Sequence, residues 1–121
     1  MAVPTKASVQ VQASASNNDA QTTTSAGQDI TTDFGAFVTA RIQNGATAPT
    51  TPCNFRVEYS RDDTDYYNPG VEYQGPSGNN GLSEFSVRIP PEVRFYRTVF
   101  TGNTGQAVTV EAEASVITDI A

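Results

Sequence analysis

The segment CNFRVEYS, residues 53–60, alternates apolar and polar side chains along most of its length. Phe55, Val57 and Tyr59 fall on one side of an extended chain, and the polar residues between them fall on the other. Successive side chains point to opposite faces in a β-strand, whereas a helix repeats about every 3.6 residues. The pattern therefore predicts a strand with one buried face and one face that meets water or a partner.

The same alternation recurs in residues 9–13, 36–43, 83–89 and 107–116. Leu82 is the only leucine, whereas valine, isoleucine and threonine are abundant, and their branched side chains suit a pleated sheet better than a helix. Loops rich in glycine, asparagine and proline separate the alternating segments. About seven to nine short strands at this spacing predict an all-β fold, a single-domain antiparallel β-sandwich that is jelly-roll-like.

Length and pattern together favour one domain with a short arm. A chain of 121 residues can bury one core of ordinary size but not two. Residues 1–8 precede the first alternating segment, so we expect a short extended N-terminal arm there and the β-sandwich domain over residues 9–121. The inward faces of the predicted strands give the expected core residues Phe55, Val57, Phe85, Val87, Ile89, Val108 and Val110.

The charge and hydropathy of the chain exclude two classes of partner. Seven lysines and arginines against thirteen acidic residues give a net charge of −6, which disfavours binding to nucleic acid. No apolar stretch approaches the roughly 18 residues of a membrane span, and the N-terminus MAVPTKASVQ lacks the apolar core of a signal peptide. We therefore expect no nucleic acid and no membrane as partner, and synthesis in a cytoplasm.

The residue types that usually carry catalysis are scarce. The chain has no histidine, and it lacks a nucleophile elbow, a phosphate-binding loop and zinc-ligand spacing. Cys53, the sole cysteine, has no histidine to activate it and is interpreted as a half-buried residue that opens a strand. Glu111 and Glu113 have the spacing of a glycosidase pair, but any solvent-facing strand with two acids has it too. We expect no enzyme, no cofactor and no metal site.

Tyrosines and one unusual strand are the candidates for binding. The five tyrosines, Tyr59, Tyr66, Tyr67, Tyr73 and Tyr96, could form an aromatic platform for a sugar, but the absence of tryptophan favours core, rim or protein-interface roles. Residues 93–100 carry apolar bulk on both faces, so we expect one face to lie under the second sheet and the other under a loop or another subunit. The predicted interface residues are Arg94, Tyr96, Phe100, Tyr66 and Tyr67.

Four stretches, FVTARIQNGATAPTTP, FRVEYSRDD, VRIPPEVRFYRTV and FTGNTGQAVTVEA, make residues 29–116 resemble small structural proteins of tailed phages. The likeness is to the jelly-roll cement or decoration proteins of capsids. It implies a virion component, made in the host cytoplasm, that binds the major capsid protein on the capsid surface and braces the shell. It also implies a homo-oligomer, a dimer or trimer, and no catalytic residues.

Two other functions remain open at this point. A phage tail or head-fibre accessory module would have the same acidic, cysteine-poor β-rich sequence. A carbohydrate-binding β-sandwich module that attaches to a host glycan is the alternative from a different class, and the tyrosines are its main support.

The acidic turn around residues 62–65 looks at first like a calcium site. Asp62, Asp63 and Asp65 resemble a fragment of a calcium-binding loop, but the later glycine and bidentate glutamate of such a loop are missing. Aspartate is also favoured in solvated turns, because its carboxylate accepts hydrogen bonds from nearby backbone amides. We interpret the segment as a turn between two strands.

We expect calcium to leave the melting temperature unchanged, because the turn offers too few ligands for a tight site. The measurement is thermal denaturation with and without calcium, followed by addition of a chelator. An upward shift that the chelator reverses would show that the turn is a calcium site after all.

Overall fold

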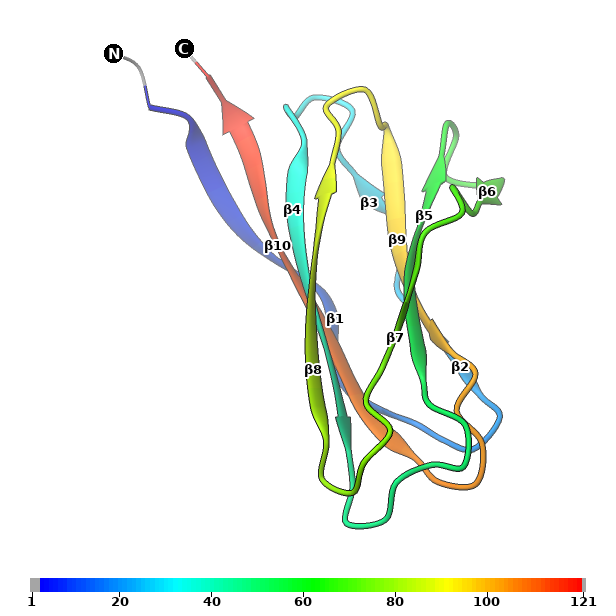
Figure 1. Cartoon of the computed structure of the whole chain (residues 1–121). Coiled ribbons are helices and arrows are strands. Elements are labelled where there is room, and N and C mark those ends of the chain that lie inside the picture. The colour runs from blue at the N-terminus through cyan, green and yellow to red at the C-terminus, as the bar shows by residue number, and fades with distance from the viewer. Residues whose placement is uncertain (1–2, 121) are drawn as a thin grey trace.

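The computed structural model of the chain describes residues 3–120, which form ten β-strands and no helix (Figure 1). These residues therefore contain no helix that could cross a membrane. The strands are β1 (Thr5–Asn17), β2 (Thr22–Thr24), β3 (Gln28–Asp29), β4 (Ala36–Asn44), β5 (Asn54–Ser60), β6 (Tyr66–Tyr67), β7 (Glu72–Gln74), β8 (Leu82–Ile89), β9 (Phe95–Thr101) and β10 (Val108–Asp119).

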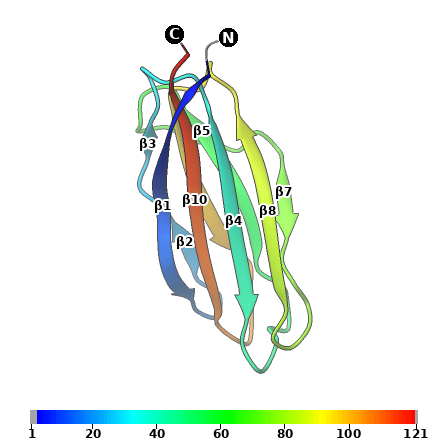
Figure 2. The same cartoon turned by 90° about the vertical axis from the view of Figure 1, so that its left-hand side faces the viewer.

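Two antiparallel sheets pack face to face, which confirms the predicted sandwich (Figures 1 and 2). The four-stranded sheet has the order β1-β10-β4-β8 and faces the viewer in Figure 2. The six-stranded sheet has the order β2-β9-β5-β6, with β3 also paired to β9 and β7 also paired to β5. The chain crosses between the sheets after β1, β3, β4, β7, β8 and β9, which is the winding of a jelly roll.

The core lies between the sheets and is built by the predicted alternation. Val38, Ala40 and Ile42 of β4 are 0% exposed, while the residues between them face outward or are only half-buried. In the core, the ring of Phe55 lies 5.1 Å from that of Phe100 and 6.0 Å from that of Phe85. Phe55 and Phe100 are paired neighbours in one sheet, whereas Phe85 belongs to β8 of the other, so the contact between Phe55 and Phe85 joins the two sheets.

The expected core residues are all inward, but they are not equally buried. Phe55, Val57, Ile89, Val108 and Val110 are buried, whereas Phe85 and Val87 are partly buried and pack against the core. The difference comes from position, because β8 is an edge strand of its sheet and one flank of its inner face has no neighbouring strand. Alternation reveals which face points inward but not how close a strand lies to the edge.

The predicted arm falls largely inside a strand. Residues 1–2 of the arm lie outside the described residues, and β1 already begins at Thr5, which is opposite Asp119 of β10. Residues 5–8 are thus held by main-chain pairing to β10, although their side chains are exposed. Main-chain hydrogen bonds need no apolar alternation, so the sequence pattern places the start of the strand too late.

A buried pair of asparagines ties the end of β1 to the loop between β9 and β10. Asn17 and Asn103 are both 0% exposed, and the Asn17 side-chain amide donates a hydrogen bond to the Asn103 side-chain oxygen. Asn103 Nδ2 in turn donates to the main-chain oxygens of Asn17, at 3.0 Å, and of Gln106, at 2.9 Å. Buried polar groups are costly unless they are paired, so these bonds define the shape of the loop.

We expect Asn103→Ala to lower the free energy of unfolding by about 2 kcal/mol, because buried polar partners lose their hydrogen bonds. Urea denaturation measures the change. Asn18→Ala is the control, since Asn18 lies in the same region but is exposed, and we expect it to have an effect of less than about 0.5 kcal/mol. Equal midpoints for wild type and Asn103→Ala would contradict this account of the loop.

Candidate functional site

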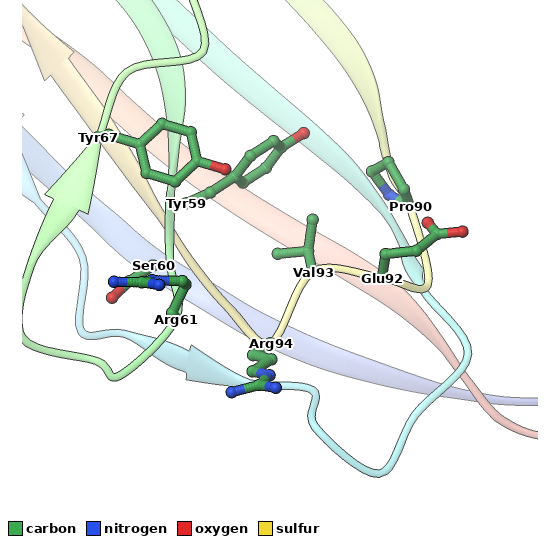
Figure 3. A pocket seen from close by; sticks show the side chains of 8 residues that line it. All are labelled: Tyr59, Ser60, Arg61, Tyr67, Pro90, Glu92, Val93 and Arg94. Carbon is green, nitrogen blue, oxygen red and sulfur yellow. The ribbon is translucent and has the colours of Figure 1, made fainter.

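A pocket of about 480 Å³ opens at one end of the sandwich, the end where both chain termini lie (Figures 1 and 3). We call it the end pocket. One side comes from the end of β5 and from β6, and the other comes from the connection between β8 and β9. Its lining residues are Tyr59, Ser60, Arg61, Tyr67, Pro90, Glu92, Val93 and Arg94.

Local turn chemistry shapes both walls of the end pocket. Pro90 and Pro91 end β8, because proline has no amide hydrogen for the ladder, and the Val93 amide then donates to the Pro90 carbonyl at 3.1 Å. On the other wall, Asp62 Oδ1 accepts hydrogen bonds from the amides of Thr64 and Asp65, both at 3.0 Å. The chain thereby reverses after β5 and enters β6.

The acidic turn thus uses at least one of its carboxylates to build local structure. Its hydrogen bonds hold the pKa of Asp62 below the usual value. Among residues 3–120, no group of three or more acidic, cysteine or histidine side chains is arranged to hold a metal ion. The effect of calcium stays a prediction.

Two tyrosines form the aromatic part of the end pocket. The rings of Tyr59 and Tyr67 meet edge to face, with centroids 6.0 Å apart and an interplanar angle of 82°. Tyr59 is half-buried, and this burial, together with the neighbouring Tyr67 and Tyr73, raises its pKa. Tyr67 is 56% exposed, so its ring is available to a ligand.

Three charged side chains line the end pocket without an ion pair to any residue that the structure describes. They are Arg61, Glu92 and Arg94, and all three are exposed. In Figure 3 the two arginines lie below the tyrosine rings, with Val93 between the rings and Arg94. Pro90 and Glu92 lie at the opposite end of the pocket from Arg61. The pocket therefore combines aromatic surface, two free positive charges and one free carboxylate.

The neighbouring arginines, by contrast, are paired on the outer face of the six-stranded sheet. Glu58, only 7% exposed, accepts from Arg56 Nε at 2.9 Å and from Arg97 Nε at 2.9 Å. Burial alone would raise the pKa of the Glu58 carboxyl, but the hydrogen bonds and charges of Arg97 and Arg56 outweigh burial and lower it. The Arg97 guanidinium also lies 4.1 Å from the centre of the Tyr66 ring, whose hydroxyl donates to Asp63.

The five predicted interface residues fall into three different environments. Arg94 and Tyr67 line the end pocket, and Tyr66 lies over Arg97 on the outer face of the six-stranded sheet. Tyr96 and Phe100 are 0% exposed and lie in the core, so they do not form a surface. They occupy the inward face of β9, which corrects their prediction as interface residues.

The end pocket contains residues that the sequence interpretation did not connect. The alternation places Tyr59 on an inward face and gives no role to Arg61 or Glu92. Two features of the sequence could have indicated the pocket, namely the double proline after residue 89 and the aspartate turn after residue 60. Each of them terminates a strand, β8 and β5 respectively, and the two strands terminate at the same end of the sandwich. Pairing those two turns needs the strand order, which alternation does not reveal.

The other two residues considered for reactivity, Cys53 and Glu111, have structural surroundings. Cys53 is 0% exposed, more deeply buried than expected, and burial raises the pKa of its thiol to about 11, which keeps it protonated at neutral pH. Glu111 lies on the outer face of the four-stranded sheet, where Arg41 Nη1 is 3.5 Å from its carboxylate. This geometry agrees with a solvated face.

No family model and no curated protein matches the sequence. Solved structures do share the fold. The exported protein XepA of PBSX aligns over 91% of this chain with a TM-score of 0.63 and 13% identity, and the chain spans 36% of XepA. The SPBc2 prophage-derived protein YomS aligns over 96% of both chains with a TM-score of 0.53 and 12% identity.

Capsid protein VP2 from a subviral particle of infectious bursal disease virus has a TM-score of 0.53 and 11% identity, with 93% of this chain and 32% of VP2 covered. A carbohydrate-binding module is also among the similar structures. At these identities the likeness is one of fold. The structural neighbours thus include prophage-derived proteins and a viral capsid protein, as the resemblance suggested.

We expect Glu58→Gln to lower the free energy of unfolding by about 2 kcal/mol at neutral pH, because two charge-assisted hydrogen bonds are weakened. The folded-state pKa of Glu58 is lowered, so its contribution is present above the unfolded pKa of about 4.3 and is lost as pH falls through the folded value. The difference between variant and wild type should therefore shrink in acid.

Urea denaturation at neutral pH and near pH 3 measures this difference. Glu113→Gln is the control, because Glu113 is exposed and makes no ion pair within residues 3–120. A gap between Glu58→Gln and wild type that is the same at both pH values would contradict the role given to the carboxylate.

Proposed function

We propose that this chain is a structural protein of a phage particle and acts as a capsid cement protein, without catalysing a reaction. In this proposal it binds the outer surface of a shell assembled from the major capsid protein and stabilises that shell. The jelly-roll fold, shared with prophage-derived proteins and a viral capsid protein, supports a particle component. The finer assignment rests on one surface feature, an exposed pair of phenylalanines.

Phe34 and Phe37 are 41% and 50% exposed at the terminal end of the four-stranded sheet. Together with Lys6, Arg88 and Ile117, which lie beside them, they form what we call the terminal patch. An exposed group of large apolar side chains is unfavourable in water, and on soluble proteins it commonly marks a contact with a partner. We infer that the terminal patch is the contact with the shell.

Hydrogen bonds within the chain fix the backbone under the terminal patch in the free protein. The Phe34 amide donates to the Ile117 carbonyl at 2.8 Å, and the Ile117 amide donates to the Gly35 carbonyl at 3.0 Å. Gly35 has a φ of 98°, and a Cβ atom there would lie 2.7 Å from the Ile89 carbonyl oxygen, so glycine is required. A rigid contact surface loses little conformational entropy on binding.

The charges of the terminal patch indicate what kind of surface it fits. Lys6 and Arg88 make no ion pair within residues 3–120, although the chain as a whole carries a net charge of −6. A partner surface with an apolar hollow and an acidic rim would complement both the phenylalanines and these cations. We propose that the major capsid protein offers such a surface on the outside of the shell.

Many copies on one shell would strengthen a contact that is modest for each copy. Each copy that bridges neighbouring shell subunits adds a contact that must break before the shell can expand. We also propose a homo-oligomer, a dimer or trimer, because a closed symmetric contact needs only one self-complementary surface in a dimer. A tail or head-fibre accessory module would use the same terminal patch on a different partner.

We expect the double substitution Phe34→Ser and Phe37→Ser to weaken binding to undecorated shells by about tenfold or more, because exposed aromatic anchors dominate many interfaces. Co-sedimentation with shells from the source phage measures the binding. The melting temperature should stay close to that of the wild type, since both side chains are largely exposed.

The matched control is Leu82→Ser, because Leu82 is 45% exposed at the opposite end of the same sheet. It should bind shells as the wild type does. Wild-type protein that sediments with tails and ignores shells would favour the tail or fibre module and would contradict the cement proposal.

A further inference from the structure

We propose that the end pocket binds an anionic saccharide, a sugar ring that carries a carboxylate or a phosphate. This site is separate from the terminal patch, because most of its residues come from the six-stranded sheet and the β8–β9 connection (Figure 3). The inference does not depend on the cement proposal, and a protein of a particle surface could have both.

The size of the end pocket suits a small ligand. Its volume of about 480 Å³ lies within the range of roughly 300 to 1,000 Å³ that is typical of ligand pockets. It is a partly open hollow between two walls, so it can accept one unit of a longer chain while the rest of that chain lies outside. A saccharide chain meets this condition.

The two tyrosines provide the surface that a sugar ring needs. The edge-to-face arrangement of Tyr59 and Tyr67 gives the pocket two ring surfaces at nearly right angles, and Tyr67 is 56% exposed. The C–H face of a sugar ring is apolar and packs against an aromatic ring, while the hydroxyls at its edge need hydrogen-bond partners. Glu92, which has no ion-pair partner within residues 3–120, offers acceptors for those hydroxyls.

The two arginines decide the charge of the ligand. Arg61 and Arg94 come from opposite walls of the pocket, lie below the tyrosine rings in Figure 3, and pair with no carboxylate in the described part of the chain. They are free in a protein that has thirteen acidic residues and only seven basic ones. A guanidinium binds a carboxylate or phosphate through paired, charge-assisted hydrogen bonds. A neutral sugar has no anionic group to accept them.

A peptide ending in a free carboxylate is the competing ligand class. It would satisfy the arginines and could place a side chain against the tyrosines. However, the free carboxylate of Glu92 on the far side of the same pocket would find no donor in an apolar peptide side chain, whereas a sugar brings several hydroxyl donors. The combination of aromatic, cationic and carboxylate groups therefore favours the anionic saccharide.

The test compares three ligands that share one ring, namely glucose, glucuronate and glucose 6-phosphate. Titrations of the whole chain are followed by isothermal calorimetry, and amide chemical shifts in NMR spectra locate the bound ligand. We expect glucuronate or glucose 6-phosphate to bind about tenfold more tightly than glucose, because a hydrogen bond to a charged group adds to the affinity. The stronger of the two distinguishes a carboxylated from a phosphorylated sugar. The shifts should concentrate at residues 59–61, 67 and 92–94.

Variants separate the role of the two arginines from that of the aromatic surface. Arg61→Gln combined with Arg94→Gln should reduce the affinity for the anionic sugar to that for glucose, and Tyr67→Ala should weaken binding of all three sugars by a similar factor. Arg41→Gln is the matched control, because the Arg41 side chain is 43% exposed and lines neither the end pocket nor the terminal patch. It should bind all three sugars as the wild type does.

Five results would overturn the proposal. Equal affinity for glucose and both anionic sugars would remove the role of the arginines, and no binding of any sugar would remove the site. Loss of binding in Arg41→Gln, or shifts away from the end pocket, would place the ligand elsewhere. Binding of the peptide Gly-Gly-Phe through its free carboxylate, without binding of either anionic sugar, would assign the pocket to peptides.

Discussion

The contact between the inner faces of the two sheets is the interaction on which the rest of the structure depends. With a single cysteine, the chain has no internal disulfide, and the ten strands include four that are only two or three residues long. Such short strands are stable only when their side chains pack against a second layer. Phe55 is central to that packing, because its ring contacts aromatic residues from three other strands.

Both candidate surfaces lie where this core ends. Tyr59 is the last inward aromatic residue of β5, at the end of the sandwich where β1 begins and β10 ends, and it is only half-buried. The turns after β5 and β8 enclose the end pocket around it. The terminal patch lies at the same end, on residues of all four strands of the four-stranded sheet and of the loop before β4. The rigid sandwich supplies fixed backbone, and the turns supply the side chains that a partner can reach.

Within residues 3–120, the cations of the chain fall into two sets, those in ion pairs on the outer faces of the sheets and those without an ion pair at the two candidate surfaces. Arg56 and Arg97 are bound by Glu58, and Arg41 lies beside Glu111, so these arginines contribute to the outer faces of the sheets. The remaining cations, which are Lys6, Arg61, Arg88 and Arg94, make no ion pair within residues 3–120 and line the terminal patch or the end pocket. These unpaired cations are available to the anionic groups of a ligand or partner.

The sequence by itself determined the all-β class, the sandwich and most of the core, because side-chain alternation with a period of two is a local property of each strand. Only the tertiary structure decided that β1 extends back to Thr5, that Tyr96 and Phe100 face the core, and that Tyr59, Tyr67 and Arg94 meet in one pocket. These features depend on which strands are neighbours and which face of β9 is covered. Strand order is set by contacts between residues far apart in the chain, and no local pattern encodes it.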